Sequence, residues 1–354
     1  MTARPRLAVS LGDVRGIGPE IVAAALVDER VRAAADLYVV GPANAGVHVD
    51  EQVGEWPTVG ERSESLAGRL AGAAVERAVD LALAGAVDGI VTAPLDKHAL
   101  LAGGYHYPGH TELLAARTGR PVAMMLAATR PGAGMPNPLR VVLATTHIPL
   151  RDVPHQLTRE TILSAVAVTR EGLREWFGIA EPRIALCALN PHAGDGGRFG
   201  REDDLLLTPA AREARIDGPF PADTVFVRAM RGAFDAVIAP YHDVGMTAIK
   251  VAAFGSAVNV TLGLPFPRTS PDHGTALDIA GQGLADPSSM IESILLCADI
   301  VRRRRTAGSD PRAQPEGSDP RSTASGQRRA QGQPTPSVDQ EGQARLNIQG
   351  VRPA

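Results

Sequence analysis

Three histidines come directly after short apolar runs of the sequence: His147, His192 and His242. Neutral imidazoles that converge on one point suit Zn²⁺ or Co²⁺ and leave a position open for water or substrate. Any one of them alone is better explained as a hydrogen-bonded loop residue, but three in equivalent places favour a metal site. An aspartate lies shortly after each histidine and either orients it or is an ordinary loop carboxylate: Asp152, Asp195 and Asp243.

A second set of residues has the chemistry of an anion site. His110 and Thr111 open an apparent helix, where free N–H groups and the helix dipole attract phosphate or carboxylate. Thr111 is also explained as an N-cap without any function. Lys250, Asn259 and Arg268 then occur in an otherwise apolar stretch. Because cations are rarely buried without a partner, a bound phosphate is favoured slightly over internal salt bridges.

The pattern of apolar runs predicts the scaffold that positions these side chains. Strands are expected at 7–10, 37–40, 89–92, 122–127, 140–145, 183–188, 236–239 and 257–262. Helices are expected at about 19–35, 64–84, 159–176 and 288–303. This alternation indicates an α/β fold with a largely parallel sheet. Since such sheets bind ligands beyond the carboxyl ends of their strands, we expect the three histidines along one edge.

Composition excludes several classes of protein. The 354 residues are enough for two domains, and an aromatic content of 4% argues against a base-stacking nucleic-acid platform. Two cysteines, Cys187 and Cys297, cannot form a disulfide framework. No run approaches the roughly 20 apolar residues of a membrane span, so a cytoplasmic protein is expected. No G-x-G-x-x-G follows the first strand, and a Rossmann cofactor site is therefore not supported.

The last part of the sequence, residues 302–354, differs from the rest. It holds ten arginines against five acidic residues, so the remaining chain carries a net charge of −8 within the overall −3. An acidic body argues against a nucleic-acid surface. The segment is poor in large apolar residues and repeats Gly-Ser-Asp-Pro-Arg, which predicts a disordered basic tail. The run Arg302–Arg305 is interpreted as the solvated end of the last helix, with RNA or membrane binding as the alternative.

Nine motifs, in this order, resemble those of the 4-hydroxythreonine-4-phosphate dehydrogenase family. They are Gly12-Asp-x-x-Gly-Ile-Gly-Pro-Glu-Ile21, Thr92-Ala-Pro-Leu-Asp-Lys97, Pro108-Gly-His-Thr-Glu112, Ala144-Thr-Thr-His147, Leu189-Asn-Pro-His-Ala-Gly194, Pro221-Ala-Asp-Thr224, Tyr241-His-Asp243, Asn259-Val-Thr-Leu-Gly-Leu-Pro265 and Arg268-Thr-Ser-x-Asp-His-Gly-Thr-Ala276. The resemblance covers essentially residues 5 to 300. It departs from the family at Val14-Arg15, where Pro-Ala is usual, and Arg15 is expected to face solvent.

The resemblance implies a fold of two α/β/α domains with a central cleft, similar to that of isocitrate and isopropylmalate dehydrogenases. Residues 1–118 with 263–301 would form the first domain, on the cofactor side. Residues 119–262 would form the second domain, which carries the metal, the substrate and the dimer contact. The active site would be completed across a homodimer interface.

The resemblance also implies roles for individual residues. A divalent metal, Zn²⁺ ahead of Co²⁺ or Mg²⁺, would be held by His147 and His192 of one subunit and His242 of the other. The phosphorylated substrate would be held by His110, Thr111, Lys250, Asn259 and Arg268. Asp223 and Lys250 are the catalytic candidates, and the acceptor of the alcohol proton is left open among these two residues and a metal-bound hydroxide. The cofactor segment would contain His273, Gly274, Thr275 and Asp278. The carboxylate of Asp278 favours NAD over NADP because it repels a 2′-phosphate, although Asp278 is also explained as a helix N-terminal carboxylate without a role in cofactor binding.

The implied reaction is the NAD-dependent oxidation of 4-phosphooxy-L-threonine to 2-amino-3-oxo-4-phosphooxybutanoate. This product decarboxylates to 3-amino-2-oxopropyl phosphate in pyridoxal 5′-phosphate biosynthesis. One alternative within the family is a dehydrogenase of D-threonate or D-erythronate 4-phosphate, since the motifs do not distinguish an amino group from a hydroxyl group at C2 of the substrate. A remote alternative is a three-histidine zinc hydrolase of phosphoesters. Neither a nucleic acid nor a membrane is expected as a partner.

Overall fold

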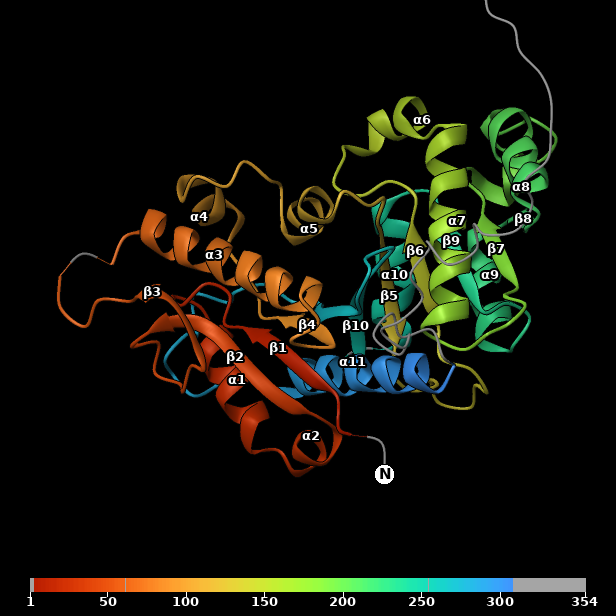
Figure 1. Ribbon diagram of the computed structural model, residues 1–354. Helices are drawn as coiled ribbons and strands as arrows, with labels where there is room; N and C mark the ends of the chain where they lie inside the picture. Colours follow the sequence, from red (N-terminus) through yellow and green to blue (C-terminus); the bar gives the residue numbers. More distant parts are fainter. Residues whose placement is uncertain (1–2, 61, 254, 308–354) are drawn as a thin grey trace, which may run out of the picture. The chain divides into compact units, whose positions relative to one another are not determined.

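The computed structural model describes residues 3–60, 62–253 and 255–307 (Figure 1). The strands are β1 Arg6–Ser10, β2 Asp36–Ala43, β3 Glu51–Glu55, β4 Gly89–Thr92, β5 Ala123–Ala128, β6 Arg140–Leu143, β7 Ile184–Cys187, β8 Asp217–Phe220, β9 Ala236–Ala239, β10 Ala257–Leu262 and β11 Arg268–Pro271. The helices are α1 Gly18–Val27, α2 Glu29–Ala34, α3 Glu64–Leu83, α4 Lys97–Ala102, α5 His110–Thr118, α6 Val153–Gln156, α7 Arg159–Glu175, α8 Thr208–Ala214, α9 Ala222–Met230, α10 His242–Ala252 and α11 Ser288–Thr306.

All of these strands belong to one sheet, in the order β3-β2-β1-β4-β11-β10-β5-β6-β9-β7-β8. The first five strands of this order are parallel to one another, and so are the last four. Between these blocks, β10 is antiparallel to β11 and to β5, and β5 is antiparallel to β6. Three reversals separate β11 from β6, so the two parallel blocks run in opposite directions. The α/β class is confirmed.

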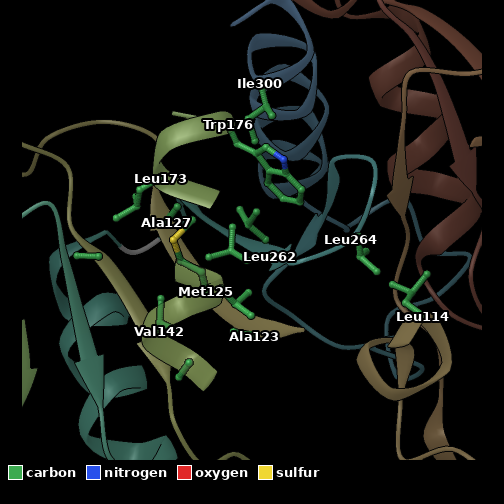
Figure 2. Close-up of a cluster of buried hydrophobic side chains, with 14 of the residues drawn as sticks. Leu114, Ala123, Met125, Ala127, Val142, Leu173, Trp176, Leu262, Leu264 and Ile300 are labelled. Atoms are coloured by element: carbon green, nitrogen blue, oxygen red, sulfur yellow. The ribbon is translucent and has the colours of Figure 1, made fainter. Parts of the chain in front are cut away.

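Helices cover both faces of the sheet, because successive strand residues point to opposite sides. On one face a continuous apolar core lies under α3 and α7, with side chains such as Val75, Ile90 and Ile238. Figure 2 shows part of this core, where Trp176 and Leu173 meet Met125 of β5 and Leu262 of β10. On the other face α1 and α11 cover the first block, and α9 and α10 cover the second block. The arrangement is three-layered.

The predicted strands and helices are all present, with boundaries that differ by a few residues. Three strands were not predicted, namely β3, β8 and β11, because they contain almost no large apolar residue. The helix predicted at 19–35 is two helices. Asp28 separates them, since its carboxylate accepts hydrogen bonds from the amides of Arg30 and Val31 and so caps α2.

Strands of the predicted first domain form the first parallel block and strands of the predicted second domain form the second, while β10 and β5 join both blocks into one sheet. The division of the chain into these two domains stays a prediction. Among the residues that the structure describes, no helix is both long and apolar enough to cross a bilayer.

Helix α11 continues to Thr306, so the first five residues of the predicted tail are helical. The prediction that Arg302–Arg305 form a solvated helix end is confirmed in part: they lie at the end of α11, where Arg302 and Arg303 are exposed but Arg304 and Arg305 are half-buried. Arg305 pairs with the buried carboxylate of Asp88 at 2.7 Å, and each of the four guanidinium groups donates to a backbone carbonyl. These bonds tie the end of α11 to the surrounding loops. Residues 308–354, the rest of the predicted tail, lie outside the described residues.

Candidate active site

A cavity of about 940 Å³ lies over the middle of the sheet, where the two blocks meet. Its walls come from segments far apart in the sequence: the residues after β4, the start of α5, strands β5, β10 and β11, the loop after β6, helix α10 and the segment after β11. The polar side chains that line it are Thr92, Lys97, His110, Thr111, Glu112, Thr146, His147, His242, Thr247, Lys250, Asn259, Arg268, Ser270, Asp272 and His273. A large cavity in which several polar side chains converge is the natural place for a substrate.

The floor of the cavity holds a buried cation. Arg268 of β11 is 1% exposed, and its guanidinium donates to Thr261 Oγ1 at 2.9 Å and to Thr92 Oγ1 at 2.6 Å. Its Nε atom has no hydrogen-bond partner, and it forms no ion pair with any residue that the structure describes. Burial lowers the pKa of Arg268 to about 9. A buried guanidinium that only neutral hydroxyls contact favours a bound anion.

Two further groups around this cation are also unsatisfied. His110 Nε2 and the side-chain oxygen of Asn259 are buried without a hydrogen-bond partner among the described residues. Burial, together with the positive charges of Arg268 and Lys97, holds the pKa of His110 well below its usual value. Helix α5 begins at His110, after Gly109, and no side chain caps it. Thr111 is the second residue of α5, so the N-cap explanation of Thr111 is wrong. The N-terminal end of α5, with its free backbone amides, faces the cavity.

Two of the three histidines lie together in the cavity wall. The ring centroids of His147, after β6, and His242, at the start of α10, are 5.4 Å apart. Asp243 Oδ1 lies 2.7 Å from His242 Nδ1, which favours the tautomer with a proton on Nδ1 and a free lone pair on Nε2. Burial, then the positive charge of Lys97, lowers the pKa of His147. Both imidazoles are therefore suited to be metal ligands.

The third histidine, His192, does not line this cavity. It lies in the exposed turn Pro191–Gly194 after β7, with a left-handed φ of 54°. The buried carboxylate of Asp203 holds the start of this turn, because it accepts from the amides of Leu189 at 2.8 Å and Asn190 at 3.0 Å. Strands β6, β9 and β7 are parallel neighbours, so all three histidines do follow strand ends at one edge.

Within one chain, the described residues contain no group of three metal ligands. The resemblance paired His147 with His192 in one subunit, whereas the structure brings His147 together with His242. Of the three aspartates that could orient histidines, Asp243 contacts one. Asp152 and Asp195 instead lie within 4 Å of arginine side chains.

The two catalytic candidates lie in different places. Lys250 of α10 lines the cavity, and its Nζ is 3.7 Å from Asp272 Oδ2 and 3.4 Å from the carbonyl oxygen of the same residue. Asp223 is an exposed residue in the first turn of α9 and does not line the cavity. Lys97 and Glu112 also line the cavity but were not predicted as site residues. Each is the charged last residue of one of the nine motifs, which is the signal that could have identified it.

The predicted cofactor residues follow β11, and only the first two of them line the cavity. His273 and Gly274 line the cavity, His273 Nε2 is buried without a partner, and a Cβ added to Gly274 would meet no atom within 4 Å. The Thr275 carbonyl accepts from Ile17 N at 2.9 Å. Asp278 is exposed, lies outside the cavity lining and is not at a helix N-terminus.

The structure corrects the expectation for Arg15. Its guanidinium makes a two-pronged contact with the carboxylate of Asp13, at 2.7 and 3.1 Å, and its side chain is only 22% exposed. Asp96 and Glu64 lie within 4 Å of the same guanidinium. Arg15 therefore neutralises the fully buried Asp13 rather than facing solvent.

The sequence and the fold of this chain are similar to those of known proteins. A family model described as "Pyridoxal phosphate biosynthetic protein PdxA" matches residues 22–297. The chain is 42% identical over 327 residues to 4-hydroxythreonine-4-phosphate dehydrogenase of Burkholderia vietnamiensis, covering 85% of this chain and 98% of that protein. The crystal structure of 4-hydroxythreonine-4-phosphate dehydrogenase from Klebsiella pneumoniae is similar with a TM-score of 0.73 and 37% identity, over 85% of this chain and 99% of the other.

A more distant solved structure has the same fold. Terephthalate 1,2-cis-dihydrodiol dehydrogenase from Burkholderia xenovorans is similar with a TM-score of 0.57 and 29% identity, over 84% of this chain and 98% of the other. The relatives at about 40% identity are matched over nearly their whole length. Six of its nine motifs contribute residues to one cavity, and this chain belongs to the family of the pyridoxal phosphate biosynthetic protein PdxA.

Proposed function

We propose that this protein oxidises 4-phosphooxy-L-threonine with NAD⁺. The products would be NADH, a proton and 2-amino-3-oxo-4-phosphooxybutanoate, which loses CO₂ to give 3-amino-2-oxopropyl phosphate. The observation that carries the proposal is the buried Arg268, which has no carboxylate partner among the described residues and lies beside the unsatisfied His110 and Asn259. The names of the relatives support the substrate class.

The phosphate would bind at the floor of the cavity. Arg268 supplies the charge, the amide end of α5 supplies N–H donors, and Thr111 and Asn259 supply short polar side chains. His110, held neutral by its surroundings, donates one hydrogen bond from the protonated ring nitrogen. These groups position the substrate, so that its C3 hydroxyl lies toward the histidines at the other end of the cavity.

The residues fit a divalent metal by the chemistry of their donors. His147 and His242 offer two neutral imidazoles, and the Asp243 contact fixes the ring of His242. His192, exposed on its turn, would complete the site from a second copy of the chain, which makes a homodimer part of this proposal. Zn²⁺ suits three imidazoles best, and Co²⁺ or Mg²⁺ are the other candidates.

The segment after β11 fits a nicotinamide cofactor. The space beside Gly274 admits a ligand close to the backbone, and the buried His273 Nε2 lacks a partner. Asp278 would favour NAD over NADP, because its carboxylate repels a 2′-phosphate. When bound, the metal supplies electrostatic stabilisation of charge at the reacting oxygen, and the nicotinamide supplies the hydride acceptor.

The proton of the C3 hydroxyl needs an acceptor. Lys250 is the candidate from this chain, since its Nζ lies in the cavity and Asp272 holds it at 3.7 Å. Asp223 is exposed on α9 and would reach the site only from a second copy. After oxidation, the new ketone lies β to the carboxylate, so that CO₂ leaves as electrons move into the ketone.

The test is NADH formation by metal-loaded protein with 4-phospho-L-threonine, run beside D-threonate 4-phosphate and D-erythronate 4-phosphate. Strong turnover of the amino acid alone supports the proposal. Turnover of the hydroxy acids alone would replace it with a dehydrogenase of sugar-acid phosphates. Release of inorganic phosphate without NADH would refute both and favour a phosphoester hydrolase.

A further inference from the structure

The segment 272–283, which carries the proposed cofactor residues, contains no helix or strand along its described length. Its backbone therefore lacks the regular hydrogen bonds that hold most of this fold in place. Inside the segment, the Ile279 amide donates to Ala276 and the Gln282 side chain donates to the carbonyl of Asp278. Such short-range bonds shape a turn but do not fix it on the protein.

The segment is held by apolar contacts of Ala276, Ile279 and Ala280 with the core and by hydrogen bonds to the start of α1. Ile17, the residue before α1, donates its amide to the carbonyl of Thr275 at 2.9 Å. Gly16 lies so close that an added Cβ would be 2.6 Å from the same carbonyl oxygen. This contact holds the first half of the segment.

Glu20 holds the second half. Its carboxylate accepts hydrogen bonds from the amides of Gly281 and of Gly283, the latter at 3.2 Å. Both glycines have left-handed φ angles, 76° and 68°, which turn their amides toward α1. A glutamate at the third position of a helix usually bonds back to the amide before the helix. Here that amide is engaged by Thr275, which leaves the Glu20 carboxylate for the segment.

We propose that Glu20 is a positioning residue for the dinucleotide cofactor. By clamping Gly281 and Gly283, it keeps the segment in the conformation that presents Gly274 to the cavity and the carboxylate of Asp278 to solvent. Glu20 itself is not among the residues that line the cavity, so it acts through the segment and not by contact with substrate. The inference rests on the proposed function, because it takes a nicotinamide dinucleotide as the ligand.

The test uses Glu20→Gln in the full-length protein, with Glu29→Gln as the control. Gln keeps one acceptor oxygen and the size of the side chain but loses the charge and one acceptor. Glu29, in the first turn of the next helix, is an exposed glutamate of the same region. NADH affinity is measured directly by nicotinamide fluorescence, and the KM values for NAD and for the phosphorylated substrate are measured separately.

We expect Glu20→Gln to weaken NADH binding and raise the KM for NAD by about tenfold, the effect of losing one hydrogen bond to a charged group. The kcat at saturating NAD, the KM for the phosphorylated substrate and the binding of inorganic phosphate stay within twofold of the wild type. Glu29→Gln behaves as the wild type. A second variant, Glu20→Asp, keeps the charge with a shorter reach and gives an intermediate NADH affinity.

Unchanged NADH affinity in Glu20→Gln would overturn the inference. So would an equal loss of NADH and phosphate binding, or loss of the folded state in both variants, because Glu20 would then support the whole structure. Wild-type protein that binds phosphate but no NADH would instead refute the proposed function, and the inference with it. The two failures are therefore distinguishable in one set of titrations.

Discussion

Replacing Arg268 by Met tests whether the buried cation is kept for a ligand. Burial lowers the pKa of Arg268 from its usual range to about 9, which corresponds to about 5 kcal/mol of unfavourable free energy for keeping the buried side chain charged. Arg268→Met removes that charge and keeps most of the apolar stem. It also leaves the hydroxyls of Thr92 and Thr261 unpaired, at a cost of roughly 1–2 kcal/mol each.

The two effects predict a variant that is more stable than the wild type by roughly 1–3 kcal/mol without ligand. Bound phosphate acts in the opposite direction, because it stabilises only the wild type. Inorganic phosphate at 100 times its dissociation constant would stabilise the wild type by about 2.7 kcal/mol and the variant not at all. Urea unfolding at pH 7, with and without phosphate, measures both quantities. Arg140→Met is the control, because Arg140 is another arginine with a pKa lowered by burial but lies outside the cavity.

Two outcomes would refute the reasoning. A variant at position 268 that still responds to phosphate would show that the anion binds elsewhere. A variant that unfolds far more easily than the wild type in the absence of phosphate would show that Arg268 is a structural residue, held by its two threonines. The control variant should keep the phosphate response of the wild type.

Three further predictions concern the other parts of the site. Asp243→Asn should reduce metal affinity roughly 10–100-fold, measured by competition with a chelator, because the ring of His242 loses its orienting carboxylate; an unchanged affinity would contradict this role. Asp278→Ala should narrow the preference for NAD over NADP in kcat/KM, and an unchanged ratio would speak against it as the ribose contact. His110 has a pKa well below its usual 6.5 in the folded protein, so the unfolded chain takes up the proton first and stability falls as the pH drops below about 6.5; His110→Gln should lessen that fall in urea titrations at pH 7 and pH 5.

The sequence allowed the strands with apolar residues to be predicted, because burial on both faces requires such residues. Strand β11 was missed for the opposite reason: its Arg268-Thr-Ser-Pro271 sequence is polar, and it is buried through hydrogen bonds and not through apolar contacts. The reversal of direction at β10 and β5 was also invisible. Strand β10 pairs with β5 from a distant part of the sequence, which no local pattern encodes, and its other partner, β11, was itself not predicted.

Some residues of the candidate site were predicted correctly from the sequence, and the positions of others were not. The phosphate residues were found because cations and amides in an apolar stretch are unusual, and the structure gathers His110, Asn259 and Arg268 around one cavity. The placement of His192 away from His147 depends on the loop held by Asp203, which the sequence did not reveal. Arg15 was misjudged because its partner, Asp13, is a buried acid only two residues away.

The order of strands has a consequence for synthesis of the protein. Strand β4 is made early, but one of its two neighbours, β11, follows much later, and the bond between Arg268 and Thr92 joins residues 176 positions apart. A nascent chain that ends before residue 268 therefore carries an open strand edge at β4, which can pair with other chains. It also has no anion pocket. Phosphate added during translation would accordingly stabilise the finished chain and leave every chain that ends before residue 268 unprotected.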